Sequence, residues 1–202
     1  IRKKRIDIEG IKKNLIPLIV AGIVLGGGWA FLFEAYHHTT VGIATMAYYC
    51  APIAVFILAP IIFREKVNSK QVVGMVAAIL GMIIVNVLGT EGEIFSIGVV
   101  YGLIAALFYA ALMITNKFVG EISAMESTWV PLIVAAILMS AYVFFTTGKI
   151  VHLPTGNDIW LVLIVGVVHT GIAYHLYFSA MQKLSGQSIS VLSYIDPGSA
   201  LL

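Results

Sequence analysis

Long apolar segments separated by short polar stretches limit most strongly what this chain can fold into. Six of them are long enough for a membrane-spanning helix, because about 20 residues at a rise of about 1.5 Å cross a hydrocarbon core of about 30 Å. They are residues 15–36, 41–63, 71–88, 97–115, 128–146 and 158–182. A seventh segment begins near Gln187 and is still apolar at Leu202. With 60% hydrophobic and 11% charged residues, the sequence predicts an all-α, polytopic helical membrane protein.

Basic residues set the expected orientation, because Lys and Arg are enriched in cytoplasmic loops. Residues 1–14 hold six of the 12 basic residues of the chain. If this N-terminal segment is cytoplasmic and the helices alternate in direction, every other basic residue except Lys149 also lies on the cytoplasmic side. We therefore expect a multi-pass protein of the cell membrane with a cytoplasmic N-terminal segment.

A pattern of residue types recurs 145 positions later in the chain. The informative pairs are Gly26 and Gly171, Phe33 and Phe178, Tyr49 and Tyr194, and Pro52 and Pro197. Each copy reads as an apolar helix, a tight connection and a second apolar helix interrupted by proline. The two copies would cross the membrane in opposite directions, so the repeat is inverted.

The repeat predicts a parent architecture of five helices plus five, of which seven are present. Residues 1–89 would be the remnant of the first repeat, with the basic cytoplasmic segment and three transmembrane helices. Residues 90–202 would be the second repeat, with four transmembrane helices, the last of them truncated. A fragment of a longer protein and a genuinely short protein are both compatible with this pattern.

Glycine and proline mark two kinds of expected bend. Three successive glycines, Gly26, Gly27 and Gly28, weaken a helix and predict a hinge. Pro52 and Pro197 each remove a backbone hydrogen bond within an apolar segment and free a carbonyl one turn earlier. The alternatives for each proline are a static kink, a gating bend, or a kink that exposes carbonyls to substrate.

Aromatic side chains away from the helix ends are candidates for a substrate site. Interfacial belts enrich Trp and Tyr, but a belt explains Tyr49 poorly, because it lies well inside its segment. We expect a cavity between the repeats that is lined by Trp29, Phe33, Tyr48, Tyr49 and Tyr194.

Ionisable residues inside apolar segments give a sharper signal, because placing them in a membrane is costly. His169 lies about 16 Å into its segment and Asp196 about 14 Å into the last one. His175 belongs to a polar stripe with Ser179 and Gln182. Asp196 is the best candidate for a proton-coupling or substrate-amine site, and an Asp–His structural pair is its alternative. For either histidine the alternative is a neutral contact between helices.

Five motifs follow one another along the chain: Trp29-Ala-Phe-Leu-Phe-Glu-Ala-Tyr36, Ile43-Ala-Thr-Met-Ala-Tyr-Tyr-Cys-Ala-Pro52, Arg64-Glu65-Lys66, Gly74 with Gly81, and Leu192-Ser-Tyr-Ile-Asp-Pro197. This ordered series resembles the drug/metabolite transporter superfamily, specifically EamA-type transporters. The resemblance covers essentially the whole chain, whose helices would correspond to helices three to nine of the ten helices in the family. The resemblance implies secondary transport of small polar metabolites, commonly amino acids and usually as export.

Other classes of function were weighed against transport. A non-transporting membrane receptor or assembly partner is the main alternative. A channel lacks a filter-like sequence, and an intramembrane enzyme lacks a recognisable catalytic motif, since His169 and His175 are not spaced for a metalloprotease. The expected partners are a small-molecule substrate, membrane lipid and a second copy in a homodimer. We expect no nucleic acid, no cofactor, no metal site and no catalytic residue.

Overall fold

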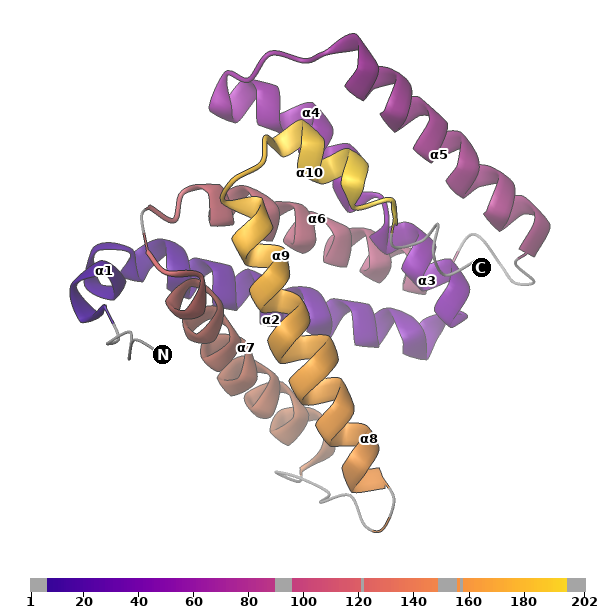
Figure 1. Cartoon of the computed structure of the whole chain (residues 1–202). Coiled ribbons are helices and arrows are strands. Elements are labelled where there is room, and N and C mark those ends of the chain that lie inside the picture. The colour runs from indigo at the N-terminus through magenta and orange to yellow at the C-terminus, as the bar shows by residue number, and fades with distance from the viewer. Residues whose placement is uncertain (1–6, 90–95, 121, 149–155, 157, 196–202) are drawn as a thin grey trace. The chain divides into compact units, whose positions relative to one another are not determined.

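The computed structural model of the 202-residue chain describes residues 7–89, 96–120, 122–148, 156 and 158–195. These residues form helices and connections, and none of them lies in a β-strand (Figure 1). The helices are α1 Ile8–Lys13, α2 Leu15–His38, α3 Val41–Tyr48, α4 Ala51–Phe63, α5 Ser69–Gly89, α6 Ile97–Lys117, α7 Ala124–Thr147, α8 Asp158–Ile164, the π-helix η1 Val165–Ile172, α9 Ala173–Met181 and α10 Gly186–Leu192. The prediction of an all-α, polytopic membrane protein is confirmed.

Five helical stretches of the described chain are long and apolar enough to cross a membrane. They are Leu15–His38, Val41–Phe63, Ile97–Lys117, Met125–Thr147 and Asp158–Met181. They correspond to five of the six complete segments expected from the sequence. The sixth, residues 71–88, lies within α5, in which the shorter apolar helix Ser69–Gly81 is found.

Helix boundaries differ from the expected ones where local backbone signals were missed. The segment 41–63 is divided into α3 and α4 by a turn at Tyr49 and Cys50. Helix α7 begins four residues before the expected start, because Ser123 has an extended backbone and serves as its N-cap. It ends where Gly148 adopts a left-handed conformation with φ of 68°, which glycine accommodates without steric cost.

The chain separates into two compact units, each built from two stretches of sequence. Unit 1 comprises Ile1–Gly26 and Thr115–Lys183, and unit 2 comprises Gly27–Ile114 and Leu184–Leu202. Both units draw on residues before and after position 90, and the proposed division into repeats 1–89 and 90–202 remains a prediction.

In unit 1, glycines on α2 let the backbone of α7 come close. A Cβ atom added to Gly22 would lie 2.8 Å from the carbonyl oxygen of Pro131. A Cβ atom added to Gly26 would lie 3.1 Å from the Cα atom of Ala135. Both distances are shorter than ordinary van der Waals contact, so this packing requires glycine. Small residues at i and i+4 are the expected means of close helix packing in lipid.

In unit 2, glycines on α6 serve the same purpose against α2 and α3. A Cβ atom on Gly98 would lie 3.0 Å from the carbonyl oxygen of Ala35, and one on Gly102 would lie 2.9 Å from that of Ala44. Gly28 approaches Phe108, since an added Cβ atom would lie 3.2 Å from the Cβ atom of that residue. Helix α2 continues without a break through the glycine triplet.

A π-helix interrupts the span that contains α8 and α9. It covers Val165–Ile172, and the hydroxyl of Thr170 donates to the carbonyl of Val165, five residues earlier, at 3.0 Å. Such wide turns are rare and often occur at functional positions. His169, a predicted site residue, lies in this segment and is exposed.

We predict that Gly22→Ala destabilises the protein by about 1–3 kcal/mol, because the added methyl group overpacks the α2–α7 contact. Gly81→Ala is the matched control, since a Cβ atom at Gly81 meets nothing within 4 Å. Equilibrium unfolding of the purified variants in mixed micelles measures the difference. Equal stability of the two variants would contradict the close approach of α2 and α7.

Candidate functional site

The break between α3 and α4 is the centre of the candidate site. Pro52 lies in the first turn of α4 and has no backbone N–H to donate. The N–H groups of Ile53 and Ala54 both donate to the carbonyl of Cys50, at 3.1 and 3.2 Å. In a continuous helix the Ile53 N–H would instead bond to the carbonyl of Tyr49. The Tyr49 carbonyl is therefore released from the helical ladder.

A tyrosine from the other end of the chain donates a hydrogen bond to the released carbonyl. The hydroxyl of Tyr194, just after α10, donates to the carbonyl oxygen of Tyr49 at 3.1 Å. Tyr194 is buried, with 8% of its surface exposed. Tyr49 and Tyr194 are the pair of tyrosines that the sequence places 145 positions apart. The predicted site residues Tyr49 and Tyr194 thus meet directly.

The helices that lead to these two tyrosines begin with the same cap. The Thr40 hydroxyl accepts a hydrogen bond from the Ile43 N–H at 3.3 Å, and the Ser185 hydroxyl accepts one from the Ser188 N–H at 3.2 Å. The backbone angles φ and ψ are −67° and 150° at Thr40 and −68° and 154° at Ser185. Thr40 and Ser185 are also 145 positions apart, so the correspondence covers a cap, a short helix and a turn.

Aromatic rings surround the break on the side of α6. The ring of Tyr48 stacks on that of Tyr109, with centroids 5.1 Å apart and planes 21° apart. It also lies 6.3 Å from the ring of Tyr49. Sequence reasoning missed Tyr109. The sequence did offer a signal for Tyr109. It lies seven residues after Gly102, so both residues share one face of the helix, and this is the face of α6 that packs on α3.

A polar stripe runs along one side of α10. Gln187, Ser190 and Tyr194 occupy positions i, i+3 and i+7, and none has more than 8% of its surface exposed. The Ser190 hydroxyl donates to the carbonyl of Gly186 at 2.7 Å. Both polar atoms of the Gln187 amide are buried and have no hydrogen-bond partner among the described residues. A buried amide in this state is costly, which makes Gln187 a candidate for contact with a bound polar molecule.

Sequence reasoning did not single out Gln187, because a polar residue in the first turn of an apolar segment resembles a helix end. The repeat offered a signal: the position equivalent to Gln187 in the first copy is Gly42. Because the first copy has a glycine at this position, the repeated architecture does not require the side-chain amide of Gln187.

Polar contacts hold α10 against α4 and α5, and Figure 1 shows α10 beside α4. A carboxylate oxygen of Glu65 accepts the Gly186 N–H at 2.9 Å. The Gln71 side chain donates to the Ser188 hydroxyl at 3.4 Å. These bonds fix the start of α10. They therefore also fix the orientation of the polar stripe Gln187, Ser190 and Tyr194 relative to the α3–α4 break.

The remaining predicted site residues lie elsewhere. Trp29 is half-buried on α2, and Phe33 is exposed, with its ring 6.3 Å from that of Tyr36. His169 and His175 belong to unit 1, where the backbone carbonyl of His175 accepts a hydrogen bond from the Ser179 hydroxyl at 2.5 Å. Asp196 and Pro197 lie outside the described residues. The structure therefore brings together Tyr48, Tyr49 and Tyr194 from the predicted set.

Comparison with known proteins gives a consistent family. The model of the EamA-like transporter family matches residues 1–87 and 96–202. The uncharacterized transporter YxxF of Bacillus subtilis (strain 168) is 29% identical over 197 residues, which cover 95% of this chain and 61% of that protein. The uncharacterized transporter YojE of the same organism is 24% identical over 200 residues, covering 97% of this chain and 64% of that protein.

A crystal structure supports the fold at lower sequence identity. It matches with a TM-score of 0.73 and 21% identity, covering 93% of this chain and 70% of the other. The chain thus spans less than two thirds of the length of the two Bacillus relatives and 70% of the solved chain.

We predict that Tyr194→Phe lowers the free energy of unfolding by about 0.6–1.7 kcal/mol, the range measured for hydrogen bonds between membrane helices. The substitution keeps the ring and removes the hydroxyl that donates to Tyr49. Tyr101→Phe is the control, because the Tyr101 ring contacts Phe31 and His38 and its hydroxyl has no described hydrogen bond. Equal losses in the two variants would show that the bond to the Tyr49 carbonyl contributes nothing specific.

Proposed function

Because the chain belongs to the EamA-like transporter family, we propose that the protein to which it belongs is a secondary transporter that exports small polar metabolites, such as amino acids, across the cell membrane. The family is one of membrane transporters, and the chain is a multi-pass membrane protein rather than an enzyme. Alternating access is the proposed mechanism. The proposed orientation keeps the N-terminal segment in the cytoplasm.

The observation that carries this proposal is the broken helix pair α3–α4 with its carbonyl bound by Tyr194. In hydrocarbon, interrupted helices are stable only where protein or water satisfies the freed backbone groups. Secondary transporters use such interruptions, within inverted repeats, to build a site near the membrane midplane. The matching caps at Thr40 and Ser185 support the inverted repeat, and with it the five-plus-five architecture.

We assign substrate contact to Tyr48, Tyr49, Tyr194 and Gln187. The tyrosine rings offer flat apolar surfaces, and the Gln187 amide offers one acceptor and two donors. The group suits a small solute with both a polar group and an apolar portion. Trp29 and Phe33 on α2, and His169 and His175 in unit 1, remain proposed lining residues. Asp196 remains the proposed proton-coupling residue.

The hinge proposed at Gly26–Gly28 has support of a different kind. The boundary between the two compact units cuts α2 between Gly26 and Gly27. Gly26 approaches α7 of unit 1, whereas Gly27 and Gly28 approach Phe108 of unit 2. A small change of backbone angle at this triplet would reorient one part of α2 without disturbing the contacts of the other part. Pro52 and Pro197 are the other proposed bending points.

We predict that the natural full-length protein shows saturable efflux of at least one amino acid, and that Gln187→Leu raises the half-saturation concentration about two- to tenfold. This range corresponds to the loss of one net hydrogen bond. The assay follows counterflow of each radiolabelled standard amino acid from proteoliposomes. Tyr48→Leu should have an effect in the same direction, because it removes the ring that stacks on Tyr109.

Ser193→Ala is the matched control for both variants. Its hydroxyl donates to the carbonyl of Ile189 at 2.9 Å within the same helical turn, so it is already satisfied. Non-saturable conductance would favour a channel, and absence of flux would favour a receptor or assembly partner. Unchanged half-saturation in well-folded Gln187→Leu and Tyr48→Leu would remove these residues from the site.

A further inference from the structure

The N-cap residue of α1 is itself bound by a carboxylate from another helix. Asp7 is the N-cap of α1, and its side chain accepts the Gly10 N–H at 2.9 Å. In a complete capping box, an acidic side chain at the third helical position returns to the N–H of the N-cap residue. Gly10 occupies that position and has no side chain. The carboxylate of Glu126 in α7 takes the role instead, because it accepts the Asp7 N–H at 3.1 Å.

A second link fixes the other end of α1. The Asn14 amide donates to the Gly10 carbonyl at 3.0 Å and accepts the Gly120 N–H at 2.7 Å. Asn14 and Glu126 are each only 8% exposed. Gly10 and Asn14, four residues apart, therefore face the connection between α6 and α7. One side of α1 is committed to protein contacts within unit 1.

The side of α1 turned away from Gly10 and Asn14 is both apolar and basic. It holds Ile8 and Lys12, four residues apart, and Leu15, the first residue of α2, continues this spacing. Glu9 and Lys13 lie on the flank between the two sides and are exposed. Ile8 is 61% exposed and Leu15 is 44% exposed, while both lysines are exposed. Ile8, Lys12 and Lys13 lie directly before the membrane span that begins at Leu15. An amphipathic helix of this kind is suited to the interface between headgroups and acyl chains.

The excess of basic residues in the N-terminal segment indicates which class of lipid α1 would bind. Residues 1–14 contain six basic and two acidic residues. Of the acidic residues, Asp7 is the N-cap of α1 and bonds to Gly10, whereas Glu9 is exposed and offsets one of the two positive charges on α1. We propose that α1 is an interfacial helix that binds anionic phospholipid headgroups through Lys12 and Lys13, with Ile8 and Leu15 against the upper acyl chains. The Glu126 bond to Asp7 holds the helix in register with the start of α7. This proposal does not depend on the transported substrate.

The test places an environment-sensitive NBD fluorophore on Ile8→Cys in a background of the full-length protein from which Cys50 and any other cysteine have been removed. The protein is reconstituted in nanodiscs of phosphatidylcholine with increasing fractions of phosphatidylglycerol. We expect the emission to shift to the blue as phosphatidylglycerol increases. Lys12→Gln/Lys13→Gln should lower the ratio of membrane-bound to water-exposed α1 about 25-fold at a given phosphatidylglycerol fraction, from about fivefold per lysine near an anionic surface.

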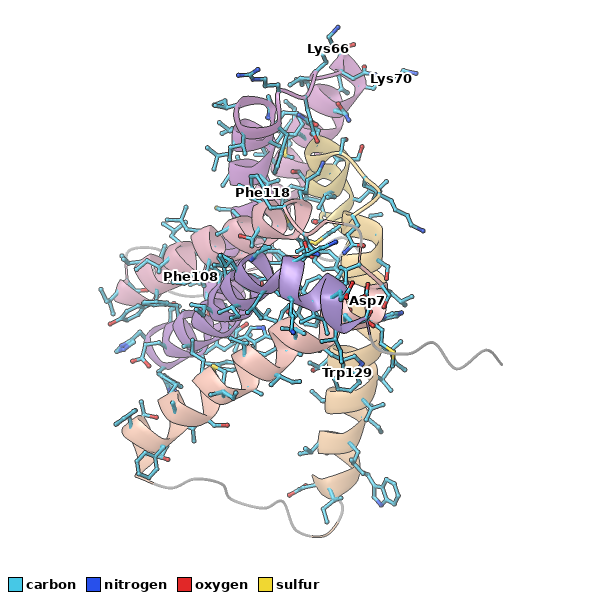
Figure 2. The ribbon with its side chains drawn as sticks, turned by 90° about the vertical axis from the view of Figure 1, so that its left-hand side faces the viewer. Asp7, Lys66, Lys70, Phe108, Phe118 and Trp129 are labelled. Carbon is cyan, nitrogen blue, oxygen red and sulfur yellow. The ribbon has the colours of Figure 1, made fainter. Side chains whose placement is uncertain are left out.

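The control removes the same charge from the other compact unit. Lys66, between α4 and α5, and Lys70, in the first turn of α5, are both exposed, and both project outward in Figure 2. Lys66→Gln/Lys70→Gln should leave the response intact. Raising the salt from about 0.1 to about 1 M shortens the Debye length from about 10 to about 3 Å and should suppress it.

Three outcomes would overturn the proposal. The first is an emission that shows a water-exposed label at every lipid composition, which would exclude an interfacial position. The second is a blue shift of equal size with phosphatidylcholine alone, which would exclude selection by charge. The third is an equal loss of response in the Lys12/Lys13 and Lys66/Lys70 variants, which would assign the effect to net charge rather than to α1.

Discussion

The hydrocarbon core of a membrane offers no water to hydrogen-bond an unpaired backbone group. Pro52 places such a group in the middle of a long apolar stretch, and the shift of the Ile53 N–H to Cys50 releases the carbonyl of Tyr49 as well. The Tyr194 hydroxyl satisfies that carbonyl from α10. The break and α10 therefore depend on one another. Tyr48 lies beside Tyr49 and stacks on Tyr109, and Gln187 lies on the same side of α10 as Tyr194.

Close packing of unit 2 positions the two partners of this bond. Gly102 lets α6 approach α3, which places Tyr109 against Tyr48. On the other side, a Cβ atom on Gly74 of α5 would lie 3.2 Å from a methyl group of Val191 on α10. Glu65 and Gln71 then fix the first turn of α10. Small residues and a few polar contacts thus supply the precision that hydrophobic burial cannot supply between helices in lipid.

Sequence reasoning predicted the elements that leave a direct pattern. Apolar length predicted the helices, and the 145-residue spacing predicted that Tyr49 and Tyr194 are equivalent. The meeting of their side chain and backbone could not be read from spacing, because it depends on how the ladder shifts after a proline. Gln187 was missed because its unpaired state is a property of burial. Tyr109 was missed because its role depends on which face of α6 meets α3.

Other features needed the backbone itself. The π-helix Val165–Ile172 has no sequence signature beyond an apolar segment with glycines. Residues 1–14 read as a basic segment, whereas the N-cap residue of their short helix, Asp7, is bound by Glu126, more than a hundred positions away. A partner supplied by another helix cannot be recognised from a local motif. Phe33 is exposed and its ring lies near that of Tyr36, so its place in the predicted aromatic set remains a proposal.

A double-mutant cycle between Pro52→Ala and Tyr194→Phe tests most directly whether the helix break creates the site. Pro52→Ala restores an N–H for the Tyr48 carbonyl and allows the Ile53 N–H to return to Tyr49, which would reseal the helix. Equilibrium unfolding in mixed micelles measures the four free energies. We predict non-additivity, with the cost of Tyr194→Phe falling toward zero in the Pro52→Ala background, a coupling of about 0.5–1.7 kcal/mol. The same Tyr194→Phe cost in both backgrounds would contradict the dependence of the Tyr49–Tyr194 contact on the break.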